Sequence, residues 1–264
     1  MRVGFIGLGN MASAMIGGIL TKGIRRPEDL VGTDCIPESR DRAQEIYQIL
    51  VTETNLEKVR KADIIFLSVK PQFYQEVIEQ IRGEMRKEQV IVSIAPGKTL
   101  QWIQNQFQQE VKLVRCMPNT PALVGEGSTG VCYNGNVTRE ELNEVMTILS
   151  SFGKASIVKE ELMDVVVGIS GSSPAYVFLF IEAMADAAVA AGMPRDQAYE
   201  FAAQAVYGSA KMVLETGKHP GVLKDMVCSP GGTTIEAIRI LEERGFRSAV
   251  MEAVLGCIDK SKNL

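Results

Sequence analysis

Short apolar runs alternate with helical patterns through the first half of the chain. The runs are rich in β-branched and aromatic residues, as in a buried sheet. Strands that alternate with helices form βαβ units and a mostly parallel sheet. The pattern up to about Ile157 therefore predicts an α/β fold, with strands at Val3 to Ile6, Leu30 to Gly32, Ile64 to Val69, Val90 to Ile94, Val111 to Cys116 and Gly130 to Tyr133.

The pattern changes near Lys159. Beyond Glu160, long stretches rich in Ala, Met and Leu, such as 175–191 and 197–214, are separated by short segments that contain Gly and Pro. This is typical of helices joined by turns. Residues 187–191 are apolar around most of a helix, which indicates burial on several sides. We predict an α/β domain over residues 1–159 and an all-α dimerisation domain over residues 160–264.

Charge and composition narrow the classes of partner. The net charge is −4, with basic and acidic residues interleaved, so no basic stripe is available for a phosphate backbone. Met1 leads directly into a predicted strand, and no apolar run reaches the roughly 20 residues that span a bilayer. The five cysteines are scattered and lack a C-x-x-C pair, as in a cytosolic protein with thiols packed in its core. We expect a cytoplasmic protein without nucleic-acid or membrane partners.

A glycine-rich motif follows the first predicted strand. Gly7-Leu8-Gly9-Asn10-Met11-Ala12 opens a predicted helix and matches G-x-G-x-x-G/A, with Ala12 in the third position. Gly7 permits the tight turn, Gly9 has no Cβ to block a pyrophosphate, and the helix N-terminus faces the phosphates. We predict that Gly7, Gly9, Asn10 and Met11 bind a nicotinamide dinucleotide; a glycine-rich turn without a ligand is the alternative.

Asp34 lies at the end of the second predicted strand. An acid there can hydrogen-bond the adenosine ribose hydroxyls and repels a 2′-phosphate, which favours NADH over NADPH. The nearest basic residues, Arg40 and Arg42, belong to the next predicted helix, so NADPH binding is possible only with a rearrangement. A turn residue before Pro37 is the other interpretation of Asp34.

The carboxyl ends of the other strands supply further candidates, because these ends line the ligand crevice of a doubly wound sheet. Val69, Lys70 and Pro71 lie at one such end and Ala95 at the next. Asn119 follows a third strand and can offer a donor and an acceptor to a carboxamide. An ordinary solvated lysine is the competing interpretation of Lys70.

Two segments of the second half precede predicted helices. Ser173 suits an N-cap and Pro174 the first helical position, and capping alone explains both. By contrast, Ser229-Pro230-Gly231-Gly232-Thr233-Thr234 has more glycines and hydroxyls than a cap needs. Bare backbone amides at a helix start bind carboxylates, so this segment predicts a carboxylate-binding site.

The single histidine, His219, lies in a His-Pro-Gly turn. A single histidine disfavours both a Ser-His-Asp catalytic triad and a metal site built from several histidines. A histidine that transfers protons is expected in a pocket and not at such a turn. We predict a structural or capping role for His219 and no metal site.

Several sequence blocks together identify a family. They are Phe5 to Met11, Val69-Lys70-Pro71, Met117 to Pro121, Ser170 to Tyr176, His219-Pro220-Gly221 with Leu223-Lys224-Asp225, and, most specific of all, Ser229 to Ile235. With these blocks the chain resembles pyrroline-5-carboxylate reductases over essentially its whole length. One departure is Ser173, where the family usually has glycine; a side chain there can narrow the approach to the helix start.

The resemblance implies a Rossmann-type NAD(P)-binding domain followed by a helical domain that binds substrate and dimerises. It implies reduction of 1-pyrroline-5-carboxylate to L-proline with NAD(P)H, in a homodimer with active sites at its interface that can assemble into larger rings. The loop formed by Ser229, Gly231, Gly232 and Thr233 would hold the substrate carboxylate, and Thr234 would be the catalytic residue near the imine nitrogen. By the same resemblance Asn55 touches the adenosine, and Lys70, Pro71 and Asn119 line the cofactor crevice.

The chemistry tolerates a site without histidine, because a cyclic imine can take its proton from water before hydride transfer. Two alternatives remain. A 3-hydroxyacid dehydrogenase needs a lysine in G-x-x-G-x-G-x-x-x-K-x-x-x-N, where this chain has Val177 when the pattern starts at Gly168. A non-catalytic, dinucleotide-sensing dimer needs no carboxylate site, so the loop at residues 229–234 disfavours it.

Overall fold

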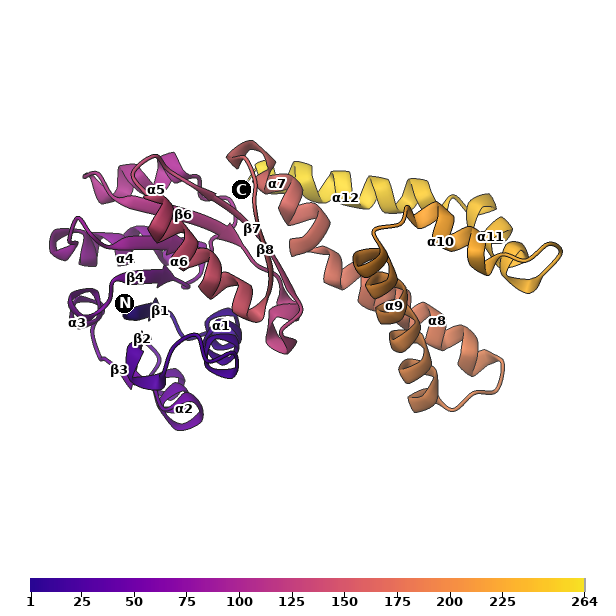
Figure 1. Ribbon diagram of the computed structural model, residues 1–264, viewed down its shortest axis with the longest axis horizontal. Helices are drawn as coiled ribbons and strands as arrows, with labels where there is room; N and C mark the ends of the chain where they lie inside the picture. Colours follow the sequence, from indigo (N-terminus) through magenta and orange to yellow (C-terminus); the bar gives the residue numbers. More distant parts are fainter. Residues whose placement is uncertain (264) are drawn as a thin grey trace. The chain divides into compact units, whose positions relative to one another are not determined.

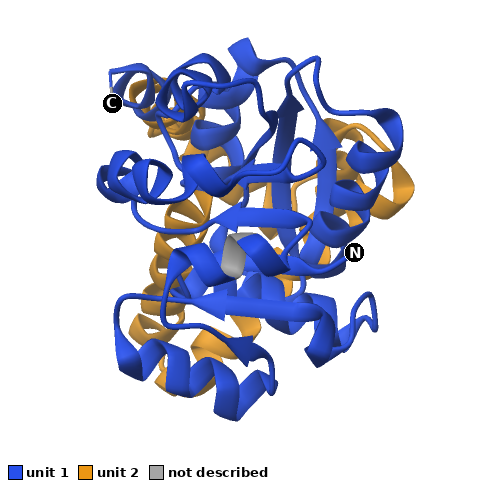
Figure 2. Cartoon of the chain, turned by 90° about the vertical axis from the view of Figure 1, so that its left-hand side faces the viewer, with its two compact units in different colours: residues 1–172, 257–264 blue, residues 173–256 orange. Residues whose placement is uncertain are grey.

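The computed structural model describes residues 1–263, apart from the side chains of Lys58 and Val59. Two compact units make up the chain (Figure 2). We call residues 1–172, together with the chain end from Cys257, the sheet unit, and residues 173–256 the helical unit. The domain division predicted after residue 159 remains a prediction; by packing, residues 160–172 group with the sheet unit.

Within residues 1–263, the sheet unit contains an eight-stranded sheet in the order β3-β2-β1-β4-β5-β6-β7-β8 (Figure 1). Neighbouring strands are parallel except β6 and β7. The parallel majority confirms the predicted fold class. The strands are β1 (Val3–Ile6), β2 (Leu30–Thr33), β3 (Leu50–Val51), β4 (Ile64–Leu67), β5 (Val90–Ser93), β6 (Lys112–Met117), β7 (Gly127–Tyr133) and β8 (Gly153–Ile157).

Helices cover both faces of this sheet. Successive residues of a strand point to opposite faces, and Phe5 belongs to the core with α1 and α6, whereas Ile6 belongs to the core with α4 and α5. All four residues of β1, β4 and β5 are buried, which explains why these strands are continuous apolar runs. The helices are α1 (Asn10–Thr21), α2 (Pro37–Tyr47), α3 (Asn55–Lys61), α4 (Tyr74–Ile81), α5 (Leu100–Phe107), α6 (Arg139–Leu149) and α7 (Met163–Val166).

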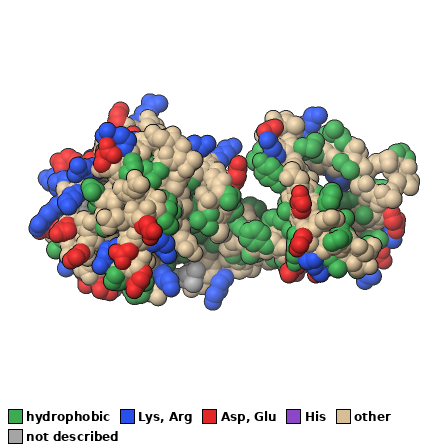
Figure 3. Space-filling view, turned by 90° about the horizontal axis from the view of Figure 1, so that it is seen from below, with side chains coloured by type: hydrophobic (Ala, Val, Ile, Leu, Met, Phe, Trp, Pro, Cys, Tyr) green, Lys and Arg blue, Asp and Glu red, His purple; other side chains and the backbone are tan. Residues whose placement is uncertain are grey.

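The helical unit contains α8 (Ser173–Ala190), α9 (Arg195–Thr216), α10 (Pro220–Val227), α11 (Thr233–Glu243) and most of α12 (Phe246–Lys262). Hydrophobic side chains lie on its surface (Figure 3). Phe178, Phe201 and Leu214 are among the exposed large ones, and Leu214 is 76% exposed. Residues 187–191, expected to be buried on several sides, are partly or fully exposed in the single chain. Apolar surface of this extent marks a protein-binding face, so their burial requires a partner.

One helical stretch, Glu160–Ala190, is long and apolar enough to cross a membrane by length and composition. Inspection of apolar runs in the sequence did not predict it. A single helix of this kind is weak evidence of a membrane span, and the same apolar surface serves equally well between two protein chains.

The segment before α8 is helical, where the sequence analysis expected an N-cap at Ser173 and a helix that begins at Pro174. Val167–Gly171 form a π-helix, in which the Ser172 amide donates to the Val167 carbonyl at 2.8 Å. The side chain of Asn119 donates to the Ser170 carbonyl at 2.9 Å. Consequently α8 starts at Ser173 and includes Pro174 as its second residue, one position earlier than predicted.

An ion pair between a buried arginine and a partly exposed glutamate joins three parts of the sheet unit. Arg115 on β6 has a side chain only 5% exposed, and its guanidinium donates to Glu160 Oε1 at 3.1 Å. The same oxygen accepts the backbone amide of Leu100, the first residue of α5, at 2.7 Å. Glu160 therefore neutralises a buried charge and satisfies a free amide at a helix start.

We predict that Glu160→Gln lowers the free energy of unfolding by about 2 kcal/mol, because Arg115 would keep its charge without a counter-charge. Urea unfolding measures this. Glu161→Gln, a change at the exposed neighbouring acid, is the control and should stay within about 0.5 kcal/mol of the original chain. Equal effects of the two substitutions would contradict the role of the pair.

Candidate active site

The glycine-rich turn has the geometry that its sequence predicts. Gly7 has φ +97°, and a Cβ there would lie 2.8 Å from the backbone of Ser68 and Val69. Gly9 is the N-cap of α1, with φ −72°, and a Cβ on it would meet nothing within 4 Å. No side chain among the described residues caps α1. Its first amides thus remain available to a phosphate, and the open space at Gly9 fits a pyrophosphate.

Asp34 holds this turn in place. One carboxylate oxygen accepts the Leu8 amide at 2.7 Å, and the other accepts the Ile36 amide at 2.9 Å. Asp34 is therefore a turn residue, as one interpretation predicted, and it also reaches the glycine-rich loop. Each carboxylate oxygen can accept a second hydrogen bond, so a ribose contact remains compatible with this geometry.

A crevice of about 210 Å³ opens beside Asp34. It brings together four residues predicted to bind cofactor: Gly7, Asp34, Asn55 and Val69. Its wall also contains side chains that the sequence analysis missed, namely Cys35, Phe73, Glu76, Val77 and Gln80. Positions 73, 76, 77 and 80 share one helical face, and this spacing is the signal that could have found them.

Asn55 lies at this crevice next to Gln80, to whose side-chain oxygen it donates at 2.6 Å. The pair joins α3 to α4 and leaves hydrogen-bonding positions on both amides. The side-chain amides of Asn55 and Gln80 can therefore hydrogen-bond the edge of an adenine or a ribose hydroxyl.

The other predicted cofactor residues lie outside the wall of this crevice. Lys70 is exposed and precedes a short 3-10 helix, η2 (Pro71–Phe73), so its position fits both a ligand contact and a solvated lysine. Ala95 is only 3% exposed, and its backbone amide donates to the Ser93 hydroxyl at 3.4 Å.

Asn119 is buried and has protein partners for both polar atoms of its side chain. The oxygen accepts the Ser128 amide at 2.8 Å, and the nitrogen donates to the Ser170 carbonyl at 2.9 Å. Asn119 therefore connects the end of β6 with β7 and with the π-helix. A contact with the cofactor carboxamide would use the remaining N–H and lone pair.

The predicted carboxylate-binding loop lies in the helical unit, at the start of α11. Gly231 has φ +67°, Gly232 is the N-cap, and no side chain of the described chain caps this helix. A Cβ on Gly232 would meet the Ser229 hydroxyl and lie 3.2 Å from the Ser229 carbonyl oxygen, so a larger residue there would require the Ser229 side chain to move. Thr233 is exposed and Thr234 is partly buried. The first amides of α11 are thus free to bind a carboxylate.

His219 has the structural role that was predicted. It is the N-cap of α10, and its Nδ1 accepts the Gly221 amide at 3.0 Å.

The cysteines follow the prediction only in part. Cys116 and Cys132 are buried, Cys35 is exposed, and Cys228 and Cys257 are partly exposed. Burial raises the pKa of the Cys132 thiol to about 12, so this thiol is inert at neutral pH.

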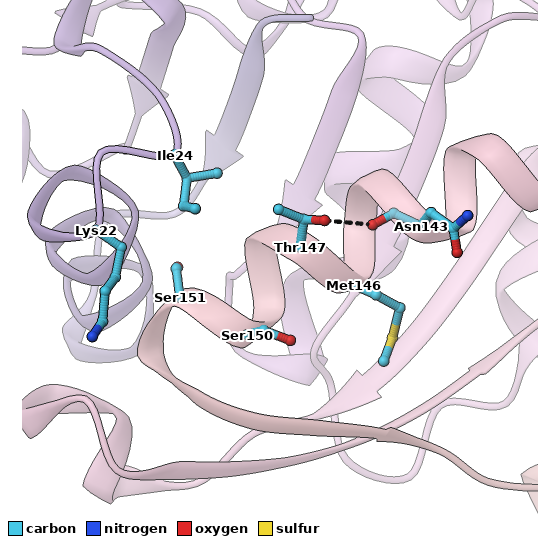
Figure 4. A pocket seen from close by; sticks show the side chains of 7 residues that line it. All are labelled: Lys22, Ile24, Asn143, Met146, Thr147, Ser150 and Ser151. Atoms are coloured by element: carbon cyan, nitrogen blue, oxygen red, sulfur yellow. Dashed lines mark hydrogen bonds between the residues drawn. The ribbon is translucent and has the colours of Figure 1, made fainter.

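A larger groove of about 740 Å³ lies elsewhere on the sheet unit (Figure 4). Lys22 and Ile24 border it from the end of α1, and Met146 and Thr147 border it from α6. None of the residues predicted to bind cofactor or substrate lines it, and it is open to solvent along its length. The candidate binding regions are therefore the crevice beside Asp34 in the sheet unit and the loop before α11 in the helical unit.

We predict that Gly9→Ala weakens dinucleotide binding roughly tenfold or more, because the methyl group would occupy the path of the pyrophosphate. The unfolding midpoint should stay near that of the original chain, since the new Cβ contacts nothing. Fluorescence titration and thermal unfolding measure the two properties. The control, Gly7→Ala, should instead destabilise the fold. Unchanged affinity in Gly9→Ala would contradict a pyrophosphate at this turn.

Comparison with known proteins agrees with this geometry. Residues 160–264 match the family model for pyrroline-5-carboxylate reductase dimerisation, and residues 2–97 match the model for NADP oxidoreductase, coenzyme F420-dependent. The pyrroline-5-carboxylate reductase of Escherichia coli (strain K12) is 51% identical over 263 residues, covering 100% of this chain and 98% of the relative.

The fold of the chain also matches the solved structures of similar proteins. The Plasmodium falciparum pyrroline carboxylate reductase, solved with NADP bound, has 35% identity and a TM-score of 0.89, covering 100% of this chain and 97% of that one. The Coxiella burnetii pyrroline-5-carboxylate reductase has 32% identity and a TM-score of 0.93, covering 99% and 97%. The chain belongs to the pyrroline-5-carboxylate reductase family.

Proposed function

We propose that this protein reduces 1-pyrroline-5-carboxylate to L-proline by hydride transfer from NAD(P)H, the last step of proline biosynthesis. The observation that carries the proposal is full-length identity of 51% to a curated reductase of this name. The dinucleotide turn and the free amides before α11 provide the two binding functions that the reaction needs. A cytoplasmic location fits this role.

A bound nicotinamide dinucleotide would supply the hydride. Gly7 and Gly9 would admit its pyrophosphate to the amides of α1, and Asp34 and Asn55 would hold its adenosine. Val69, Lys70, Pro71, Ala95 and Asn119 are proposed contacts along the strand ends, with Asn10 and Met11 in the first turn of α1.

The substrate would be held by the loop before α11. The backbone amides at Thr233 and Thr234 can bind its carboxylate, and the positive end of the helix dipole favours that charge. The Gly232 amide instead donates to the Ser229 carbonyl at 3.1 Å and closes the loop. Glu236, the acid in the first turn of α11, pairs with Arg239 at 2.8 Å, so it does not compete for these amides. The Thr234 hydroxyl can then hydrogen-bond near the imine nitrogen.

The proposed assembly is a homodimer, because residues 160–264 match the dimerisation model of the family. The exposed apolar side chains of α8 and α9 support pairing of two chains through this region. Each active site would lie at the dimer interface. Assembly of dimers into larger rings remains a prediction.

NADH is the proposed preferred cofactor. Two carboxylates, Asp34 and Glu76, line the crevice, and no Lys or Arg is among its described wall residues. The guanidinium groups of Arg40 and Arg42 donate to the backbone carbonyls of Asp34 and Leu8, at 2.6 and 3.3 Å. A 2′-phosphate would have to draw one of them away from its carbonyl while facing two negative charges.

We predict that Thr234→Ala lowers the rate of pyrroline-5-carboxylate reduction at least tenfold, because a positioned hydroxyl contributes to transition-state binding. The affinity for NADH should not change, since every wall residue of the cofactor crevice lies in the sheet unit. Loss of NADH absorbance and a binding titration measure the two properties.

Thr234→Ser is the control for this experiment, because it keeps the hydroxyl, and it should retain most of the activity. Full activity in Thr234→Ala would remove the residue from its role. NADH binding without any turnover by the original chain would overturn the proposed function and favour a dinucleotide sensor.

We predict that Asp34→Ser shifts the ratio of kcat/KM for NADH and NADPH toward NADPH, because the charge that repels the 2′-phosphate is lost. Steady-state kinetics with both cofactors measure the ratio. Asp34→Asn keeps an acceptor for the Leu8 amide and removes the charge, so it separates electrostatics from loop geometry. An unchanged ratio in both variants would show that Asp34 does not select the cofactor.

A further inference from the structure

Tyr74 is a buried residue at the first position of α4, and it is not among the described wall residues of the cofactor crevice. Its hydroxyl donates to the carbonyl of Leu67, the last residue of β4, at 2.6 Å. It accepts the hydroxyl of Ser93, the last residue of β5, at 3.1 Å, and the amide of Ile94 at 3.3 Å. A phenol has one donor and two acceptor positions, so all of its hydrogen-bonding capacity is used at the ends of two adjacent strands.

The sheet separates at this point. Leu67 and Ser93 are register partners, but the next bond of the ladder, from the Ile94 amide to the Leu67 carbonyl, is stretched to 3.5 Å. The Tyr74 hydroxyl lies between the groups that separate and bonds to both. Burial raises the pKa of this phenol well above its usual value, so the hydroxyl stays protonated and remains a donor.

The two strand ends lead directly to the crevice. Ser68, the residue after Leu67, donates from its side chain to the Gly7 carbonyl at 2.8 Å, and Val69 lines the crevice. On the other strand, the Ser93 hydroxyl accepts the Ala95 amide at 3.4 Å. The Tyr74 hydroxyl therefore bonds to the two strand ends that lead to the support of the glycine-rich turn and to residues 94 and 95.

We propose that Tyr74 is a positioning residue for the dinucleotide, and that its hydroxyl fixes the ends of β4 and β5 at the spacing the cofactor requires. The inference rests on the proposed function, because it assigns the crevice to NAD(P)H. It needs no contact between Tyr74 and the cofactor. The ring is fully buried and supplies packing, whereas the hydroxyl supplies the register of the strand ends.

The test is Tyr74→Phe in the full-length protein, with the dissociation constant of NADH measured by fluorescence without substrate. Phenylalanine keeps the ring, so the core stays filled, while the Leu67 carbonyl and the Ile94 amide lose a partner. We expect the dissociation constant and the KM for NADH to rise about tenfold, since small displacements of a binding frame have large effects. The KM for pyrroline-5-carboxylate at saturating NADH should change little.

Ile81→Val is the matched control. Ile81 ends the same helix and belongs to the same core as Tyr74, but it makes none of the bonds at the strand ends. It should lower the unfolding midpoint and leave NADH affinity unchanged. Unchanged NADH affinity in Tyr74→Phe, or an equal loss in Ile81→Val at matched stability, would overturn the inference.

A second variant covers the case in which Tyr74→Phe fails to fold. Ser93→Ala removes the hydroxyl that donates to Tyr74 and leaves the tyrosine in place, and it should weaken NADH binding in the same direction. Unchanged affinity in that variant would count against the inference. The binding measurement is independent of turnover, so a protein that binds NADH but does not reduce the pyrroline would refute the proposed function alone.

Discussion

The site depends on a contact between two stretches of backbone at the end of the central strands. Gly7 passes so close to Ser68 and Val69 that a Cβ at Gly7 would lie 2.8 Å from their backbone atoms. The closeness lets Ser68 hydrogen-bond the Gly7 carbonyl, and Asp34 fixes the next residue from the other side. The glycine-rich turn that leads into α1 is therefore held in place before any ligand arrives, which reduces the ordering that binding requires.

Local patterns were sufficient to predict the fold class and the dinucleotide turn. A strand, a glycine turn and a helix follow one another within Val3–Thr21, so sequence spacing alone fixes their geometry. Both interpretations of Asp34 describe part of its environment, because its carboxylate accepts a turn amide and Asp34 also lines the crevice.

Several structural features that depend on residues far apart in the sequence, or on a second chain, were not predicted. The π-helix before α8 has a partner in Asn119, which is 51 residues away from Ser170 in sequence, and no local pattern encodes that bond. Phe73, Glu76 and Gln80 are individually ordinary surface residues of a helix. They become a binding wall only because α4 follows β4 directly at the crevice. The exposure of residues 187–191 likewise reflects a partner chain that a single sequence does not display.

The exposed apolar side chains of the helical unit have a consequence for how the protein is made. In a subunit that has not yet paired, Phe178, Phe201 and Leu214 are exposed to water. Burial of these side chains by association of two subunits is a second-order process, so its rate depends on the concentration of subunits. Thermal midpoints should accordingly rise with protein concentration, as expected when association stabilises the folded chain, and chains expressed at low abundance would be the ones most exposed to proteolysis.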